Sequence, residues 1–350
     1  CHFSGNAIVD NWIHLLSKIL MLQSEFLKNQ IAKIQSSSFE TLALDCFHFQ
    51  SMHNQVYQEF IHHLGIQVKE VKSILEIPFL PIDAFKFHEI KTDYWDPQTR
   101  FLSSGTEGQK RSVHALKDLD WYKSNVVRNF ELFFPDFREF DFFALLPGYL
   151  ENKNSSLIQM FRYLESYSIH HDSTKLYSND FKLLHRGILS SLDKGRKVFL
   201  LGVSFALLDF CIEFPISDNR LVVMETGGMK TTGRSYLKEE ILHWLRAGFN
   251  ASDIVSEYGM TELLSQAYAM DGKNYACPTT LKVMVSDLTD PFCFLDAGHR
   301  GRLNIIDLAN LDTCCFIQTG DAGLLQPDGK FQVLGRITGE DLRGCNLMYE

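Results

Sequence analysis

The length, composition and charge of this sequence exclude several classes of protein before any motif is considered. Its 350 residues, 45% hydrophobic and 22% charged, are typical of a globular protein with one large core or two domains. A net charge of −9 without a basic block argues against a nucleic-acid partner. No uncharged apolar run reaches the ~18 residues needed to cross a membrane.

The cysteines argue against a structural metal site. All eight are scattered along the chain and no C-x-x-C pair occurs, although zinc sites favour that spacing. A chain of this size with irregularly spaced cysteines is expected to keep them reduced in the cytoplasm. The sequence starts at Cys1 without a signal-peptide pattern and without methionine, so we expect the natural start to lie upstream.

Residues 1–100 are predicted to form a helical layer that docks on the rest of the chain. Apolar side chains recur near helical spacing over 6–33, which predicts an amphipathic helix. A second helix is predicted over 51–65, where Gly65 suits a left-handed cap. The two prolines of 77–81 exclude regular helix there and predict an extended connection.

Residues 101–280 alternate between predicted strands and helices. Short apolar runs that end in glycine or polar residues predict buried strands over 141–146, 197–202 and 220–224. Helices are predicted over 118–134, 155–165 and 235–247. This alternation predicts an α/β fold with a mostly parallel sheet flanked by helices. In such folds ligands bind where the strands end.

Residues 281–350 are predicted to form a small β-rich subdomain with a C-terminal tail. Short strands separated by turns are predicted over 281–286, 302–307, 313–317 and 331–334. The sequence therefore predicts three regions in order: a helical region, an α/β core and a β-rich end.

A glycine-rich turn over 101–111 is the most informative stretch. It runs from an apolar pair through small hydroxyl and glycine residues to the two cations Lys110 and Arg111. Such a turn exposes backbone N–H groups, adds hydroxyl donors and brings positive charge, so its composition predicts a phosphate-binding turn. The spacing does not match the Walker motif. An ordinary surface turn is the alternative.

Four separated segments occur in an order that resembles one enzyme superfamily. They are the turn at 103–111, Tyr258-Gly259-Met260-Thr261-Glu262, Thr319-Gly320-Asp321, and Gly335-Arg336 followed by Arg343-Gly344. Each alone is a weak signal. Their joint order and separation resemble the adenylate-forming enzymes, which include acyl-CoA synthetases, adenylation domains and firefly luciferase.

Two further stretches narrow the resemblance. They are 144–151, continued by Asn154-Ser155-Ser156-Leu157, and the ending Arg343-Gly344-Cys345-Asn346-Leu347. With the short length, they make the chain most similar to the acyl-protein synthetases of the bacterial bioluminescence fatty-acid reductase and to their phenylacetate–CoA ligase relatives. The resemblance covers roughly residues 75–350.

The resemblance implies ATP-dependent activation of a carboxylic acid, with ATP and Mg²⁺ as cofactors. The acid, a long-chain fatty acid in the narrower family, would form an acyl-adenylate and pyrophosphate. The residues that would wrap the phosphates are Ser103, Ser104, Gly105, Thr106 and Gly108. The family's lysine falls on Arg111 here, and its second threonine falls on Glu107, a carboxylate that needs a balancing cation beside phosphates.

The resemblance also implies the nucleotide and metal contacts. Thr226, Gly227 and Gly228 would form one wall of the adenine pocket, and the glycines would let the base approach closely. Tyr258, followed by Gly259 and Met260, would supply the facing aromatic surface, and Thr261 would contact the α-phosphate. Glu262 would hold Mg²⁺. Asp321 would accept the ribose hydroxyls, with Arg336 beside it.

Each of these residues has a plainer alternative. Tyr258 could be core packing, Asp321 a turn cap, and Arg336 a surface cation. Glu262 could complement the dipole at a helix start. Function is favoured because all four belong to the ordered pattern.

The end of the sequence suggests an acyl carrier. In the family a lid domain with a catalytic lysine follows the Gly-Arg segment, whereas this sequence ends at Glu350 and has no lysine beyond Lys330. We therefore expect the lid to be absent. The R-G-C match implies that Cys345 receives the acyl group and passes it to a reductase-like partner protein, and nearby positive charge favours its thiolate. Cys314 and Cys315 are predicted core residues that could compete for this role.

Two other functions stay open at this point. The same adenylation could serve transfer to coenzyme A or another small acceptor, or the chain could be a non-catalytic scaffold or partner-binding subunit that retains the fold. A serine hydrolase is not supported, because Gly202-Val203-Ser204-Phe205-Ala206 lacks the closing glycine of the nucleophile elbow. Ser204 is instead expected beside the acyl pocket or in the core.

Overall fold

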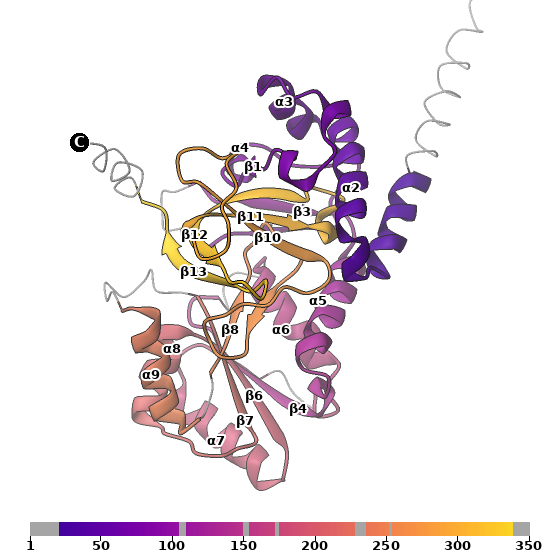
Figure 1. Cartoon of the computed structure of the whole chain (residues 1–350). Helices are drawn as coiled ribbons and strands as arrows, with labels where there is room; N and C mark the ends of the chain where they lie inside the picture. Colours follow the sequence, from indigo (N-terminus) through magenta and orange to yellow (C-terminus); the bar gives the residue numbers. More distant parts are fainter. Residues whose placement is uncertain are drawn as a thin grey trace, which may run out of the picture.

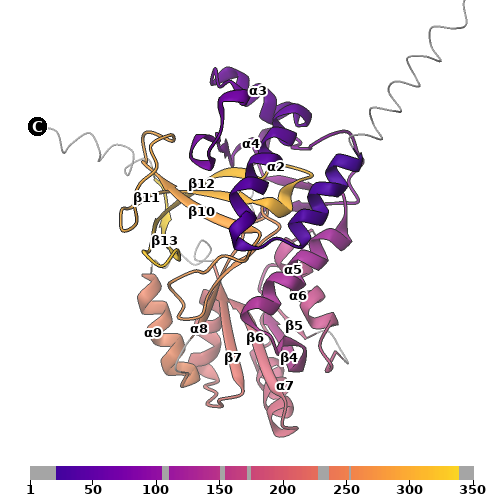
Figure 2. The same cartoon turned by 45° about the vertical axis from the view of Figure 1, so that its right-hand side comes forward.

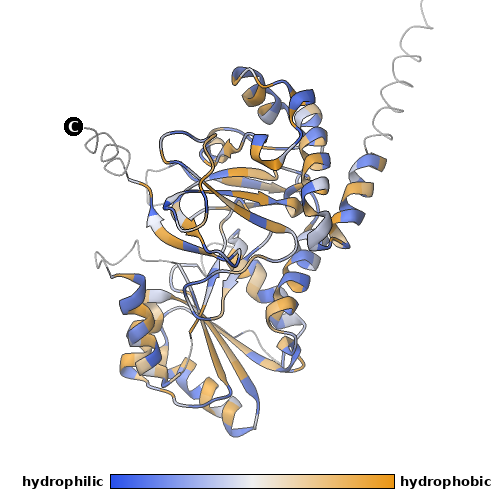
Figure 3. Cartoon of the chain, viewed as in Figure 1, coloured by the Kyte–Doolittle hydropathy of each residue, from blue (hydrophilic) through white to orange (hydrophobic). Residues whose placement is uncertain are grey.

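Two β-sheets with helices packed on them form the described chain (Figure 1, Figure 2). The computed structural model describes residues 21–104, 110–149, 154–171, 175–227, 236–251 and 254–338. Hydrophobic residues are concentrated along the strands of both sheets (Figure 3). They form two buried cores, one from the middle of the chain and one that joins residues 27–90 to residues 258–331.

The first sheet has six strands in the order β5-β4-β6-β7-β8-β9. Its bounds are β4 (Phe140–Leu145), β5 (Leu176–Tyr177), β6 (Lys197–Val203), β7 (Leu221–Thr226), β8 (Val255–Tyr258) and β9 (Ala267–Ala269). All are parallel except β9, which closes the edge antiparallel to β8. Every residue of β4 is buried, as expected for a parallel sheet covered on both faces. The carboxyl ends of the parallel strands meet at one edge.

The helices around this sheet are α5 (Leu119–Phe133), α6 (Ser156–Ser166), α7 (Phe181–Asp193), α8 (Ser204–Glu213) and α9 (Lys238–Phe249). Helices α6 and α7 contact β4, while α8 packs against β6, β7 and α9. Side-chain caps fix three of these helix starts: Asp118 accepts from the Trp121 N–H, Ser155 from the Ile158 N–H, and Asp180 from the Leu183 N–H.

The second sheet joins the two ends of the described chain. Strand β12 pairs parallel with β1 and antiparallel with β11 and β13, and β10 pairs with β11. The bounds are β1 (Leu80–Pro81), β10 (Leu281–Ser286), β11 (Gly301–Asp307), β12 (Phe316–Leu325) and β13 (Phe331–Arg336). Residues 21–32, which are helical, lie at this end of the molecule with α2 (Phe39–His53), α3 (Gln55–His63) and α4 (Ala84–Phe87) (Figure 1).

A separate hairpin of β2 (Thr99–Leu102) and β3 (Val113–Leu116) carries the glycine-rich turn. The short 3-10 turns are Ser36–Ser38, Val68–Glu70, Ile74–Glu76, Phe137–Glu139 and Leu308–Asn310. None of the helices within the described ranges has both the length and the apolar run needed to cross a bilayer.

The predicted fold class is confirmed, and most errors lie in element bounds. The helix predicted over 51–65 is present as α3, but its predicted start is wrong, because the chain turns at Asn54, whose side chain accepts from the Tyr57 N–H and starts α3. The preceding α2 already begins at Phe39. Gly65 has the expected positive φ, 69°. The strand predicted over 313–317 is shifted, because it begins at Phe316 and continues as β12.

The sequence does not predict α7 or α8. Helix α8 has one exposed face, but this face carries Phe205 and Ile212 beside Asp209 and Glu213, so it lacks the polar face that marks an amphipathic helix. Its buried residues are Ser204, Ala206, Leu207, Leu208, Phe210 and Cys211.

Candidate functional site

Three residues of the predicted nucleotide segments meet around one carboxylate. The Tyr258 hydroxyl donates to Asp321 Oδ2 at 2.9 Å, and Arg336 Nε lies 2.9 Å from Asp321 Oδ1. Asp321 and Arg336 face each other across β12 and β13, whereas Tyr258 ends β8 of the other sheet. This cluster therefore joins the two sheets at the carboxyl end of β8.

The Asp321 carboxylate retains capacity for a ligand. A carboxylate offers about four acceptor positions, so the bonds from Tyr258 and Arg336 leave positions for further donors. Asp321 is almost buried, while the Arg336 side chain is 53% exposed. Gly320 allows this approach, because an added Cβ there would lie 3.2 Å from Arg336 Nη1.

The Tyr258 ring belongs to an aromatic group at the same place. Its centroid lies 5.4 Å from that of Phe331 and 5.9 Å from that of Tyr275, both in edge-on arrangements. Burial, followed by the negative charge of Asp321, raises the pKa of Tyr258 well above its usual value. The hydroxyl therefore stays protonated and remains a donor. Tyr258 is part of the core, as the plainer alternative expects, and also a hydrogen-bond partner of Asp321.

Glu262 lies in a turn and not at a helix start, so the helix-dipole alternative is wrong. Its side chain is nearly buried and accepts a hydrogen bond from the Ser112 hydroxyl, while its carbonyl accepts from Asn310 Nδ2 at 2.8 Å. Burial raises the pKa of Glu262, although Ser112 and the positive charges of Arg336 and Lys86 oppose the rise. A cation beside this carboxylate would favour its ionised form.

The described residues offer Mg²⁺ one carboxylate and not a complete cage. No group of three or more His, Cys, Asp or Glu side chains gathers in these parts of the chain. Mg²⁺ commonly binds through one or two carboxylates and completes its shell with phosphate oxygens and water. Glu262, which lies beside the base of the predicted phosphate turn, fits that mode of binding.

The base of the glycine-rich turn is closed by a pair of serines. Ser103 Oγ accepts from the Ser112 N–H at 2.9 Å, and the Ser103 N–H donates to the Ser112 carbonyl at 3.1 Å. Because Ser112 also donates to Glu262, the turn starts beside that carboxylate. The next residue, Ser104, is hydrogen-bonded to the Tyr149 hydroxyl.

His114 ties the hairpin to the motif that contains Tyr258, and the sequence does not signal this contact. Its Nδ1 lies 2.8 Å from the Thr261 carbonyl oxygen, and its Nε2 lies 3.0 Å from Thr313 Oγ1. Burial lowers the pKa of His114 to about 4, so the ring is neutral at pH 7. In this state Nδ1 donates to Thr261 and Nε2 accepts from Thr313. The partners are 147 and 199 residues away, so local spacing cannot predict them.

The predicted adenine wall lies at the carboxyl end of β7, next to β8. Thr226 Oγ1 donates to Glu257 Oε2 at 2.6 Å. An added Cβ on Gly227 would meet no described atom within 4 Å, which is the open space that a closely approaching base requires. Ser204 is buried at the start of α8, where its hydroxyl donates to Glu225 Oε2 at 2.6 Å.

Five predicted site residues lie outside the described residues: Gly105, Thr106, Gly108, Gly228 and Cys345. Arg111 is described and exposed at the end of the turn. Cys314 and Cys315 are fully buried, and burial raises the pKa of Cys314 to about 12. This confirms their predicted place in the core and removes the thiolate that an acyl carrier needs.

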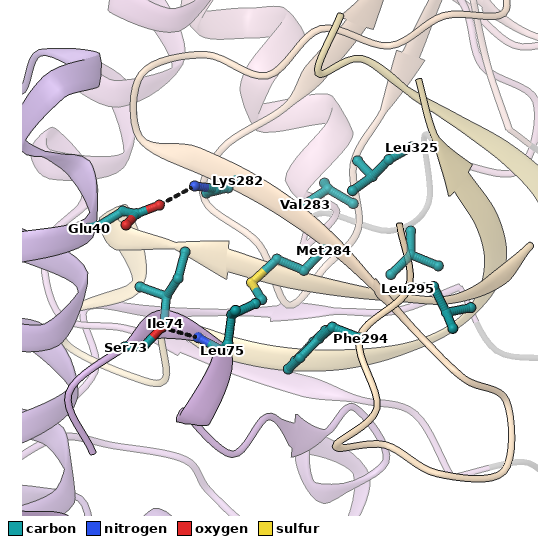
Figure 4. Close-up of a pocket in the computed structure, with 11 residues that line it drawn as sticks. Glu40, Ser73, Ile74, Leu75, Lys282, Val283, Met284, Phe294, Leu295 and Leu325 are labelled. Atoms are coloured by element: carbon teal, nitrogen blue, oxygen red, sulfur yellow. Dashed lines mark hydrogen bonds and ion pairs between the residues drawn. The ribbon is translucent and has the colours of Figure 1, made fainter. Parts of the chain in front are cut away.

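A groove elsewhere on the surface shares no residue with this site (Figure 4). It lies between Ser73–Leu75 and the side chains of β10, with Phe294 and Leu295 along it. Lys282 Nζ and Glu40 Oε1, 2.8 Å apart, form an exposed ion pair beside it. The groove is therefore separate from the residues that the sequence singles out.

Comparison with known proteins shows a fold likeness without sequence similarity. No protein-family model matches the chain, and no curated protein matches it. The 2-hydroxyisobutyryl-CoA ligase in complex with 2-HIB-AMP and CoA, in its thioesterification state, matches with a TM-score of 0.64 at 11% identity, over 89% of this chain and 71% of the ligase. An open conformation of that ligase, also with 2-HIB-AMP and CoA, gives 0.62 at 12% identity, over 89% of this chain and 78% of the ligase.

A third match is weaker. ATP-bound MatB from Rhodopseudomonas palustris gives a TM-score of 0.48 at 15% identity, over 70% of this chain and 49% of MatB. The ligase matches are matches of fold. They confirm the fold that the ordered motifs imply, which this chain shares with the 2-hydroxyisobutyryl-CoA ligase.

Proposed function

We propose that this chain activates a carboxylic acid with ATP, forming an acyl-adenylate and releasing pyrophosphate. The observation that carries the proposal is the meeting of Tyr258, Asp321 and Arg336, which come from the predicted nucleotide segments, at the carboxyl end of a parallel strand. The fold likeness to a ligase that holds an acyl-AMP supports the same assignment.

In this reaction a carboxylate oxygen of the acid attacks the α-phosphorus of ATP, and the bond from that phosphorus to pyrophosphate breaks. Two anions have to meet, so oriented donors and positive charge must neutralise the phosphates. The residues of the turn that would donate to the phosphates are Ser103, Ser104, Gly105, Thr106 and Gly108. Arg111 would supply the cation, and Thr261 would donate to the α-phosphate.

Glu262 would hold Mg²⁺ beside this turn. When bound, the ion neutralises charge on the phosphate oxygens. The near burial of Glu262 and its bond from Ser112 orient the carboxylate toward the base of the turn.

The nucleoside would lie between the two sheets. Asp321 would accept the two ribose hydroxyls at its remaining acceptor positions, while Tyr258 and Arg336 hold its carboxylate in place. The base would enter the open space before Gly227. This arrangement uses residues that are already paired in the protein, so little reorganisation accompanies binding.

For the second step we propose transfer of the acyl group to Cys345. The thiolate attacks the acyl carbonyl carbon, the bond to the AMP oxygen breaks, and a thioester forms that can pass to a partner protein. The R-G-C ending supports this step, and the same resemblance makes a long-chain fatty acid the first acid to test. Coenzyme A is the second candidate acceptor, because a fold neighbour is a CoA ligase with CoA bound.

ATP–pyrophosphate exchange with a panel of fatty acids tests the first step. Exchange that depends on ATP, Mg²⁺ and an added acid supports the proposal, and no exchange with any acid overturns it in favour of a non-catalytic scaffold.

Labelled acid tests the acceptor. We expect Cys345→Ser to abolish hydroxylamine-sensitive label on the protein while pyrophosphate exchange continues. Cys293→Ser, which changes an exposed cysteine far from the predicted site in sequence, is the matched control and should keep the label. Full turnover of Cys345→Ser with coenzyme A as acceptor would instead identify a CoA ligase.

A further inference from the structure

Glu257 occupies the face of β8 opposite to Tyr258, because successive strand residues point to opposite sides of a sheet. Its side chain is almost buried. Oε2 accepts from the Thr226 hydroxyl at 2.6 Å, and Oε1 lies so close to Gly259 that an added Cβ there would be 2.3 Å away. The nucleotide contacts proposed above do not use this carboxyl group.

Two buried polar groups beside Glu257 have no partner in the part of the chain that the structure describes. Gln266 Oε1 and the Tyr268 hydroxyl form no hydrogen bond with any described residue, although Gln266 is 4% exposed and Tyr268 is fully buried. Tyr268 lies directly opposite Glu257 in the β8–β9 pairing. Gln266 Cγ and Glu257 Cδ both lie 3.4 Å from the position of an added Cβ on Gly259. Buried polar atoms are nearly always paired in native proteins, so this group calls for a partner.

The same group lies next to the residues proposed above to hold the nucleotide. Thr226, which donates to Glu257, precedes the open space at Gly227. Tyr149, whose hydroxyl is bonded to Ser104 of the phosphate turn, feels the negative charge of Glu257. An acid whose carboxylate meets the phosphates at Ser104 would therefore extend toward Glu257.

We infer that the acid cluster (Glu257, Gln266 and Tyr268) binds a hydrogen-bond donor, an amino or hydroxyl group, that is carried by the activated acid. The inference rests on the proposed function and narrows its substrate class. Glu257 and Gln266 present acceptor oxygens, so one donor group on the acid pairs with both. The unsubstituted hydrocarbon chain of a fatty acid gives these two oxygens no donor. A fatty acid that carries a hydroxyl group would fit both the proposed activation of a fatty acid and the binding of a donor by this cluster.

The experiment has two arms, and ATP–pyrophosphate exchange by the full chain is the readout of both. The amino arm compares an acid with the same acid carrying one amino group, and the hydroxyl arm makes the same comparison for one hydroxyl group. A site built to bond a substrate donor strongly rejects the analogue that lacks it. We expect kcat/KM to be at least about tenfold higher for the donor-bearing acid in one of the two arms. Preference in the amino arm assigns an ammonium group, and preference in the hydroxyl arm assigns a hydroxyl.

The failures of the two proposals are distinguishable. Exchange with equal kcat/KM for substituted and unsubstituted acids in both arms overturns the inference and leaves the adenylation proposal intact. No exchange with any acid overturns adenylation itself.

Variants of the acid cluster separate recognition from a structural role. Glu257→Gln keeps the size of the side chain and should reduce the preference at least about tenfold. Gln266→Met removes an oxygen that has no partner to lose, so the thermal midpoint of the free protein should stay the same or rise while the preference falls. If Glu257→Gln does not fold, Gln266→Met decides.

Gln50→Met is the matched control for a buried glutamine. Gln50 is fully buried, its Nε2 donates to the Leu311 carbonyl at 2.9 Å, and its Oε1 accepts from the Cys315 N–H at 2.9 Å. This substitution should lower the thermal midpoint and leave the preference between acids unchanged. If Gln266→Met lowers the midpoint as Gln50→Met does and keeps the preference, Gln266 is structural and the inference is overturned.

Discussion

The two faces of strand β8 differ in how completely their polar groups are paired. On one face Tyr258 donates to Asp321, which also holds Arg336. On the other face Glu257 accepts from Thr226, while two neighbouring polar atoms have no partner among the described residues. Each of these polar side chains on the first face therefore has a partner among the described residues, whereas two polar atoms on the second face do not.

This difference fits a site that binds one constant and one variable part of its ligands. In the proposed reaction the nucleotide is the same in every turnover, so its contacts can be formed in advance. The acid differs among enzymes of this chemistry, and unpaired groups that await a substrate donor supply discrimination. Substitutions on either face therefore have different expected signatures.

Asp321→Asn should break the paired face and have the largest effect. Asparagine keeps the size but loses the charge to which Arg336 bonds and to which the ribose hydroxyls are proposed to bond. Hydrogen bonds to charged groups contribute about 1.5–3 kcal/mol each, so kcat/KM for ATP in pyrophosphate exchange should fall at least about 100-fold. Asp328→Asn, in the exposed turn of the same hairpin, removes only an ion pair with Lys330 and should leave exchange unchanged. Wild-type exchange by Asp321→Asn would show that Asp321 does not bind the nucleotide.

His114 and Glu257 should change the free energy of unfolding in opposite directions as the pH falls. Burial lowers the pKa of His114, which holds the Thr261 carbonyl, to about 4. Burial raises the pKa of Glu257 to about 7; Thr226 and the charge of Lys238 oppose this rise, and the charge of Glu225 adds to it. Between pH 6.5 and about 4, a histidine in the unfolded chain is protonated while folded His114 stays neutral. The free energy of unfolding therefore decreases as the pH falls through this range. Between about pH 7 and 4.5, folded Glu257 becomes protonated while a glutamate in the unfolded chain stays ionised. The free energy of unfolding therefore increases as the pH falls through this range.

Two variants should expose these opposing contributions. Relative to wild type, the free energy of unfolding of His114→Gln should rise by up to about 3 kcal/mol as the pH falls from 7 to 4.5. That of Glu257→Gln should fall by a similar amount over the same range. Urea unfolding at several pH values measures both differences, and other titrating groups cancel in each comparison with wild type. Parallel pH profiles for wild type and both variants would contradict this account.

Much of the fold can be predicted from sequence where one pattern dominates. The run of β4, apolar except for Asp141, and the side-chain caps of α5 and α6 place these elements nearly correctly. The meeting of Tyr258, Asp321 and Arg336 follows from the ordered motifs and not from any local pattern. Helix α8 is missed because Phe205 and Ile212 lie on its exposed face, which weakens the periodic signal.

The contacts that sequence cannot supply are those between residues without a motif. His114 is a lone histidine whose partners are set by how the hairpin docks on the turn after β8. Glu257 precedes the recognised motif by one residue, but its burial and its unpaired neighbours depend on the pairing of β8 with β7 and β9. Only the folded chain brings these groups together.

The smallest effect should come from Tyr258→Phe, which tests whether the paired face needs the hydroxyl or only the ring. Phenylalanine keeps the packing against Phe331 and Tyr275 but leaves Asp321 one donor short. The lost bond to a charged group should reduce kcat/KM for ATP about tenfold, with little change in KM for the acid. Tyr275→Phe is the matched control, because its ring joins the same aromatic group while its hydroxyl lies 3.4 Å from Lys238 Nζ and not beside Asp321. If both variants exchange pyrophosphate like wild type, the Tyr258 ring contributes packing alone, and the nucleotide contact at Asp321 depends on Arg336.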